Sequence, residues 1–231
     1  MSDSVTRRRR APRGAGEQLH DEILDAATDL LLHSGDEKAV SIRSVAQRVG
    51  VTPPSIYLHF ADKTALLDAV CGRYFEKLDE EMQAVAAACE SPIDMLRAQG
   101  LAYVRFALKT PELYRIATMV HGDPGSGVDL TLNSSAFVHM RASVEALISE
   151  GSYPAGDPTT LALELWTAAH GVAAQLISRP YLPWGDVEEF ADRVLRAMCL
   201  GHIASGAVTP EDTPQTIVNW LKEAVDDRQR R

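Results

Sequence analysis

The sequence has few cysteines and no long apolar run. Its 231 residues include only Cys71, Cys89 and Cys199, an odd number without a Cys-x-x-Cys pair. This pattern argues against a disulfide framework and favours a reducing cytoplasm. No stretch of about 20 uncharged apolar residues could span a membrane, and no apolar stretch follows the N-terminal arginines as a signal peptide would require. We therefore expect a cytoplasmic protein with no membrane partner.

Strand patterns and catalytic motifs are also missing. Apolar and polar residues alternate over no useful length, while 45% of the residues are hydrophobic, with alanine and leucine throughout. This composition favours an all-α fold. The sequence contains no G-x-S-x-G, H-E-x-x-H, Walker or G-x-G-x-x-G motif, and its seven histidines are scattered. We expect no enzyme, no cofactor and no metal site.

Negative charge dominates the chain but not its first part. The net charge is −9, yet residues 1–60 are neutral, so residues 61–231 carry all of it. Five arginines lie in the stretch Arg7-Arg8-Arg9-Arg10-Ala-Pro-Arg13. Such an arm either lies along the phosphates of DNA or is simply a solvated tail. We predict a disordered basic arm over residues 1–16.

Two short helices joined by a glycine turn are predicted next. An amphipathic helix over residues 18–32 ends before Gly35, and residues 42–49 form a second helix between Ser41, its cap, and Gly50, its stop. A third helix begins after Thr52, its expected cap, and runs to about residue 59. Small Ala46 lets the second and third helices cross closely, which is the helix-turn-helix pattern.

Two prolines open the third of these helices. Pro53 and Pro54 follow Thr52, at positions where helical N–H groups have no intrahelical partner, so the missing donors cost nothing. They fix φ at the start of the predicted recognition helix and give it a stiff apolar tip. In the major groove, such a tip suits contact with a thymine methyl group.

Residues 41–70, "SIRSVAQRVGVTPPSIYLHFADKTALLDAV", resemble the DNA-binding segment of the tetracycline-repressor (TetR) family of bacterial regulators. With the first helix, the resemblance covers about residues 18–70. The family's Tyr-x-His-Phe pattern and following lysine stand here as Tyr57, His59, Phe60 and Lys63. The resemblance implies that Tyr57 and Lys63 bind DNA phosphates, a role that suits a phenol and an ammonium group.

The remaining contacts to DNA are assigned by residue type and position. Arg43, at a position that reaches a guanine in some family members, is the best candidate for reading a base, and Arg48 is a weaker one. The hydroxyls of Ser44, Thr52 and Ser55 suit phosphate or base. His59 either joins these contacts or packs beside Phe60 against the following helix.

The resemblance implies three parts: the arm, a DNA-binding domain over residues 17–63, and a helical domain over residues 64–228 that binds a ligand and forms the homodimer. Within the last, "LELWTAAHGVAAQLI" resembles the Trp-x3-His-Gly pattern of one C-terminal subgroup. Trp166 and His170 share a helix face. They line a ligand cavity or pack in the dimer core.

Side chains in the middle helices are the candidates for ligand contact: Tyr103, Phe106, Tyr114, Met119, Phe137 and His139, with Trp166 and His170. The helices around residues 161–178 and 187–205 are expected to form a four-helix dimer interface through Ala174, Ile177, Phe190, Val194 and Met198. Gly171 and Gly201 would allow close approach. The lack of a Lys/Arg cluster in the middle helices favours a mostly apolar or cationic effector.

These features together predict a homodimeric repressor that leaves a near-palindromic operator in double-stranded DNA when a small molecule binds. A ligand-dependent swing of the helix from residue 63 to 89 would change the spacing of the two recognition helices. The alternative is a protein of the same fold that activates transcription or no longer binds DNA.

Overall fold

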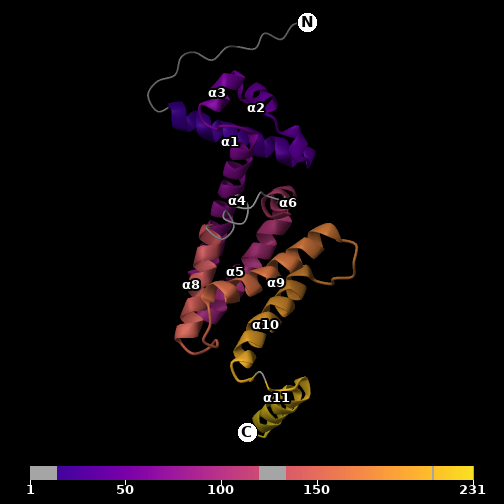
Figure 1. Ribbon diagram of the computed structural model, residues 1–231. Helices are drawn as coiled ribbons and strands as arrows, with labels where there is room; N and C mark the ends of the chain where they lie inside the picture. The colour runs from indigo at the N-terminus through magenta and orange to yellow at the C-terminus, as the bar shows by residue number, and fades with distance from the viewer. Residues whose placement is uncertain (1–14, 120–133, 210, 231) are drawn as a thin grey trace.

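All regular structure in the computed structural model is helical over the residues that it describes, which are 15–119, 134–209 and 211–230 (Figure 1). The all-α expectation is confirmed. The helices are α1 (Ala15–Ser34), α2 (Ile42–Val49), α3 (Pro53–Tyr57), α4 (Lys63–Ala86), α5 (Pro92–Lys109), α6 (Pro111–Met119), α8 (Ser135–Ser149), α9 (Pro158–Ser178), α10 (Val187–Ser205) and α11 (Pro214–Gln229), with a short 3-10 helix η1 (Glu37–Ala39).

Capping residues explain why several helices begin and end where the sequence predicts. Gly35 ends α1 with a positive φ of 63°, and Ser41 and Gly50 bracket α2. The Asp62 carboxylate accepts a hydrogen bond from the Ala65 N–H at the start of α4. The predicted arm lies outside the described residues up to residue 14, and Ala15 already belongs to α1.

The chain builds two hydrophobic cores. The N-terminal core, formed by α1 to α3 and the start of α4, buries Ile23, Leu24, Ala26, Ala27, Leu31, Val40, Val45, Ala46, Ile56, Phe60, Leu66 and Val70. The C-terminal core is larger and takes residues from the rest of α4 and from α5, α6, α8, α9 and α10. Helix α4 serves both cores, with Val70 in one and Tyr74 in the other.

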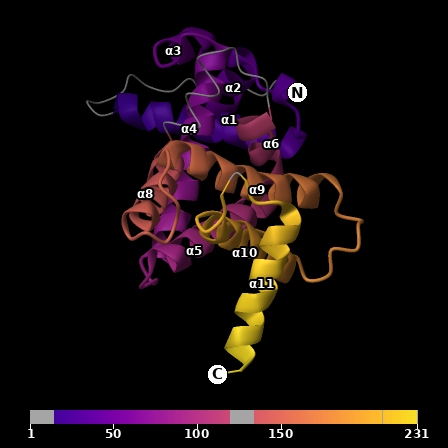
Figure 2. The ribbon, with the colours of Figure 1, turned by 60° about the horizontal axis from the view of Figure 1, so that its bottom comes forward.

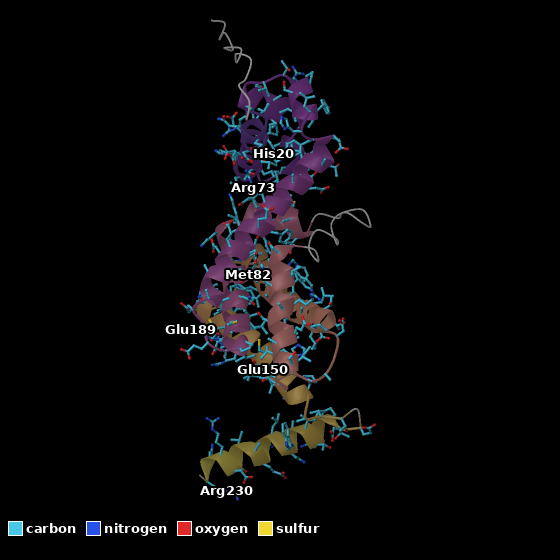
Figure 3. All side chains as sticks on the ribbon, turned by 90° about the vertical axis from the view of Figure 1, so that its left-hand side faces the viewer. His20, Arg73, Met82, Glu150, Glu189 and Arg230 are labelled. Atoms are coloured by element: carbon cyan, nitrogen blue, oxygen red, sulfur yellow. The ribbon has the colours of Figure 1, made fainter. Side chains whose placement is uncertain are left out.

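The N-terminal unit stands at one end of the molecule and α4 runs from it into the C-terminal bundle (Figure 1). Arg73 lies where the two parts meet (Figure 3). Its guanidinium is 2.8 Å from Asp25 Oδ1 of α1. Helix α6 is a second link, because Leu113 packs against both cores and Ile116 against the N-terminal one.

Helix α11 extends away from the bundle (Figure 2). It contains no buried residue, although Val218, Trp220, Leu221 and Val225 are large and apolar. Among the described residues, no helix is both long and apolar enough to cross a membrane.

Candidate DNA-binding surface and effector cavity

A capping box fixes the start of the helix-turn-helix. The Ser44 N–H donates to Ser41 Oγ (3.0 Å), and the Ser41 N–H donates to Ser44 Oγ (2.9 Å). The Ser44 hydroxyl also lies 3.0 Å from the Ala39 carbonyl oxygen. The Ser44 hydroxyl, which was predicted to contact DNA, therefore already makes hydrogen bonds within the protein.

The turn itself depends on one glycine. Gly50 has a φ of 78°, in the left-handed region that side chains with a Cβ rarely adopt. Its N–H and that of Val51 both donate to the Ala46 carbonyl oxygen at 3.0 Å. This geometry joins α2 to α3 as the sequence predicts.

Thr52 occupies the capping position of α3, but the predicted side-chain cap is wrong. Its side chain makes no capping hydrogen bond. The prolines explain this result: Pro54 has no N–H, and the Ser55 N–H is already bonded to the Thr52 carbonyl oxygen (2.9 Å). The Thr52 and Ser55 hydroxyls, 3.2 Å apart, thus bond each other rather than the backbone.

Helix α3 is also two residues shorter than predicted and ends at Tyr57. At the end of the helix, Tyr57 and the following Leu58 are 54% and 85% exposed, while Ile56 is fully buried. Pro53 and Pro54 are exposed as well. Leu58 was not among the sequence candidates. Its place between Tyr57 and His59 in the Tyr-x-His-Phe pattern was the available signal.

Arg43 is exposed and, among the described residues, has no hydrogen bond or ion pair. By contrast, Arg48 on the same helix is 2.8 Å from Asp29 Oδ2 of α1. We define the recognition surface as the exposed residues Arg43, Thr52, Pro53, Pro54, Tyr57 and Leu58. The Arg43 guanidinium is the one positive charge of this surface. It is available to a hydrogen-bond acceptor on DNA, because no side chain of the described residues pairs with it.

Two further predicted DNA contacts flank this surface. Lys63 Nζ donates to the Glu37 carbonyl oxygen (2.9 Å) and lies 3.6 Å from Glu37 Oε1, which fixes its position beside η1. The His59 ring is partly exposed and lies 6.0 Å from the His20 ring of α1, between ring centroids. His20 stacks on Phe60 at 4.9 Å, so α1 also supports this end of the motif.

The C-terminal core contains a cavity between α4, α5, α8, α9 and α10. Its wall consists mainly of Phe75, Leu78, Met82, Leu96, Arg97, Gln99, Gly100, Tyr103, Ala136, Phe137, Met140, Leu165, Trp166, Ala169, Leu195, Met198 and Cys199. Of the predicted ligand contacts, Tyr103, Phe137 and Trp166 are in this wall. Met198, predicted for the dimer interface, is there too.

The cavity is small as it stands. Its free volume is about 30 Å³. A single water needs roughly 10–15 Å³, and a cavity that holds benzene measures about 150 Å³. Met82, Met140 and Met198 supply part of the wall, and Met82 lies within the bundle (Figure 3). Methionine side chains rotate easily, so this wall is suited to expansion around a larger molecule.

A hydrogen-bonded cluster adjoins the cavity. Tyr114 of α6 is fully buried, and its hydroxyl lies 2.9 Å from His170 Nδ1 and 3.1 Å from the His170 carbonyl oxygen. The Tyr103 hydroxyl is 3.3 Å from the same Nδ1 atom. Trp166 stacks on His170 with ring centroids 4.9 Å apart. The cluster therefore connects a cavity-wall residue with α6.

Burial sets the charge of this cluster. It raises the pKa of Tyr103 well above its ordinary value and that of Tyr114 to about 12, and it lowers the pKa of His170. Removing a charged form from water is costly, so all three groups are held neutral near pH 7. The cluster acts through hydrogen bonds and not through charge.

The other predicted ligand residues lie elsewhere. Phe106 packs in the core, 5.0 Å from the Tyr74 ring. His139 is exposed, and its Nδ1 is 2.8 Å from Asp79 Oδ1. The Met119 side chain lies outside the described residues.

The predicted dimer residues sit on α9 and α10. Ala174, Ile177, Phe190 and Val194 are partly buried against the C-terminal core. An added Cβ at Gly171 or Gly201 would meet nothing within 4 Å, so both glycines face open space. Leu200 and Ile203, close to Gly201 in the sequence of α10, are exposed.

Comparison with known protein families agrees with this division of the chain. Residues 23–70 match the model for bacterial regulatory proteins of the tetR family, and residues 96–198 match the model for the tetracyclin repressor-like C-terminal domain. The chain belongs to the TetR family. It is thus a member of a family of DNA-binding transcriptional regulators, which are generally not enzymes. The Trp-His-Gly subgroup suggested by Trp166, His170 and Gly171 stays a prediction.

Individual TetR relatives are distant. The tetracycline repressor protein class D of Escherichia coli is 31% identical over 101 residues, which are 44% of this chain and 43% of that protein. The chain thus matches less than half the length of this relative. The nucleoid occlusion factor SlmA of Edwardsiella ictaluri is 26% identical over 178 residues, 75% of this chain and 89% of that protein.

Solved structures share the fold. A protein of unknown function from Rhodococcus sp. RHA1 superposes with a TM-score of 0.69 at 24% identity, over 80% of this chain and 95% of that chain. At this level of identity, the likeness concerns the fold alone.

Proposed function

We propose that this TetR-family protein is a sequence-specific, homodimeric repressor that a small, mostly apolar effector releases from DNA. The observation that carries the proposal is the recognition surface, where Arg43 and Tyr57 are exposed while the residues beneath them are buried. An unpaired guanidinium can donate two parallel hydrogen bonds to a guanine. Tyr57 and Lys63 would bind phosphates and position the surface without reading sequence.

The effector site is assigned to the cavity in the C-terminal core. Its apolar wall and its enclosure by helices are typical of small-molecule sites. A ligand larger than the present free volume would have to displace wall residues, including Tyr103. Because Tyr103 and Tyr114 both approach His170 Nδ1, such a displacement would disturb the anchor of α6.

Helix α6 would carry this change to the DNA-binding unit. Leu113 and Ile116 pack against the N-terminal core, one on each side of Tyr114 in the sequence. A shift of Tyr114 would therefore move side chains that support α1 and α4. Effector and DNA binding are then linked, because each favours a different placement of the N-terminal unit.

The dimer is assigned to α9 and α10. Gly171 and Gly201 leave room for a partner helix, and the exposed Leu200 and Ile203 add apolar surface on α10. The Cβ of a leucine at Gly171 would meet nothing within 4 Å among the described residues of its own chain, whereas the side chain would clash with a partner helix packed there. Gly72 of α4 also has open space and serves as a matched control. We expect Gly171→Leu to sediment as a monomer and Gly72→Leu as a dimer; a dimeric Gly171→Leu protein would move the interface elsewhere.

Selection from a library of random DNA duplexes tests the central claim. The full-length protein should enrich a sequence with two symmetry-related half-sites about one helical turn apart. Tyr57→Phe and Lys63→Ala should weaken binding to selected and random duplexes alike, since both contacts are to phosphate. If the protein enriches no sequence and stays monomeric, the proposal is wrong.

A second candidate is nucleoid occlusion, the role named for SlmA, because that similarity spans three quarters of this chain. Mapping the bound sites on the chromosome separates the two. Sites confined to promoters favour repression, whereas sites scattered between and within genes favour nucleoid occlusion. Reporter transcription from a bound promoter then separates repression from activation.

A further inference from the structure

Gln99 is a polar residue inside the apolar cavity. It lies on α5 with an exposed fraction of 2%, and its neighbours in the wall on the same helix include Leu96, Gly100 and Tyr103. Glutamine is rarely this deeply buried without a hydrogen-bonding role, because the loss of water from an amide is costly. Its hydrogen bonds therefore indicate what the cavity can recognise.

Only half of the Gln99 amide is satisfied within the part of the chain that the structure describes. Ser143 Oγ of α8 donates to Gln99 Oε1 at 3.2 Å and shares its one proton with the His139 carbonyl oxygen, 3.3 Å away. No described residue accepts a hydrogen bond from Gln99 Nε2. This amide nitrogen carries two N–H groups in a wall that is otherwise mostly apolar. Gln99 Nε2 is not among the fully buried side-chain atoms of the described residues that lack a partner, which are Tyr153 Oη and His202 Nε2, so it keeps some accessible surface. An acceptor brought by a ligand could therefore bind there without displacing a protein partner.

The charges around the cavity exclude a strongly ionic ligand. Arg97 is the one charged side chain in the described wall, and its Nε is 2.6 Å from Asp192 Oδ1 of α10. The carboxylate of Asp192 already neutralises this guanidinium. An ionic ligand would thus enter the core without a free counter-charge, which is unfavourable.

We propose that the effector is an uncharged, mostly apolar molecule whose oxygen acceptor, such as a ketone or ester carbonyl, accepts a hydrogen bond from Gln99 Nε2. This inference rests on the proposed function, in that it takes the cavity as the effector site. Gln99 would then select among apolar molecules of similar size, while the methionines of the wall adapt to their shape.

Matched pairs of ketones and alkenes test the proposal on the full-length protein. Suitable pairs are acetophenone with α-methylstyrene and 2-acetonaphthone with 2-isopropenylnaphthalene, which differ in replacing C=O by C=CH2. Binding constants from calorimetry or ligand-observed NMR should favour the ketone by about three- to tenfold in the wild-type protein, the range expected for one hydrogen bond.

Variants assign this preference to Gln99. Gln99→Met keeps the length of the side chain but removes its donor, so the ratio of ketone to alkene affinity should fall to about one. Leu96→Met is the matched control, since it alters the apolar wall on the same helix and should leave the ratio unchanged. Circular dichroism checks that both variants keep the helical fold.

The outcomes separate this inference from the proposed function. If wild-type protein binds ketones and alkenes equally well, or if Gln99→Met retains the preference, the role of Gln99 is wrong while the cavity stands. Ala169→Phe adds more side-chain volume than the cavity has free, so it should abolish the binding of both members of a pair. Circular dichroism must show that this variant also keeps the helical fold. If neither compound binds the wild-type protein, or if both still bind Ala169→Phe, the cavity is not the effector site and both proposals fail.

Discussion

The two cores of the protein differ in how they are filled. The N-terminal core contains mostly alanine and branched aliphatic side chains. The residues of the recognition surface lie outside this core. The C-terminal core contains a cavity, three methionines in its wall and a buried glutamine. The free volume and the adaptable methionines of the C-terminal core suit the effector site that we propose there. Helices α4 and α6 join the two cores.

The largest expected effect comes from creating a cavity in the N-terminal core. Ile56→Ala removes a fully buried side chain beneath the recognition surface and should destabilise the N-terminal unit by about 3 kcal/mol. Met140→Leu in the other core conserves volume and should cost less than about 1.5 kcal/mol. DNA binding should disappear for the first and persist for the second.

Two spectroscopic probes distinguish the cores in this experiment. All three tryptophans, Trp166, Trp184 and Trp220, lie in the C-terminal part, so their fluorescence does not report on the N-terminal core. Urea unfolding of Ile56→Ala should begin at a lower concentration by circular dichroism than by fluorescence. Coincident transitions would mean that the two cores unfold as one unit.

A smaller effect is expected at the recognition surface. Arg43→Ala should lower affinity for the selected sequence by about 2 kcal/mol and leave affinity for random duplexes nearly unchanged. Arg48→Ala is the control, because Arg48 is occupied by Asp29. Fluorescence anisotropy with both duplexes measures the difference. An equal loss on both sequences would show that Arg43 contacts phosphate and not a base.

Substitutions in α6, which links the two cores, should have smaller effects than those at Ile56 and Arg43. Tyr114→Phe removes one hydroxyl from His170 and should lower the free energy of unfolding by about 1 kcal/mol. The same variant should weaken the ability of a cavity ligand to release DNA, whereas Tyr103→Phe, with the longer contact of 3.3 Å, should alter stability less. A Tyr114→Phe protein with normal ligand-dependent release would exclude this hydroxyl from the coupling.

The smallest effect concerns pH. Burial lowers the folded-state pKa of His170 below the value of about 6.5 expected for the unfolded chain. The stability that His170 contributes is therefore fully present above about pH 6.5 and is lost as the pH falls through the folded-state pKa. His170→Gln should lose less stability than the wild type between pH 7.5 and 5.5, as measured by urea unfolding. An identical loss of stability in both proteins would show that His170 does not contribute to this pH dependence.

The sequence predicted features that depend on local chemistry. Ser41, Gly50 and the two prolines determine where α2 and α3 begin and end, because caps and φ restrictions act over a few residues. The side-chain cap at Thr52 failed for an equally local reason, the missing N–H of Pro54. That reason was readable in the sequence, since the prolines were already assigned to the first two helical positions.

Contacts between distant helices were not predictable in the same way. Gln99 meets Ser143 and Tyr114 meets His170 only because α5, α6, α8 and α9 pack together. A glutamine in an amphipathic pattern reads as a surface residue until its neighbours are known. Residue type selected His139 and Phe106 as ligand contacts, but helix packing places one at the surface and the other beside Tyr74.

Helix α11 has a consequence for how the chain responds to a protease. None of its 16 residues is buried, so little tertiary packing stabilises it, and an isolated helix of this length is marginal in water. Its backbone amides should therefore exchange with deuterium far sooner than those of α9. Within the described residues, trypsin should cleave α11 first, after Lys222 and Arg228, while α9 stays intact.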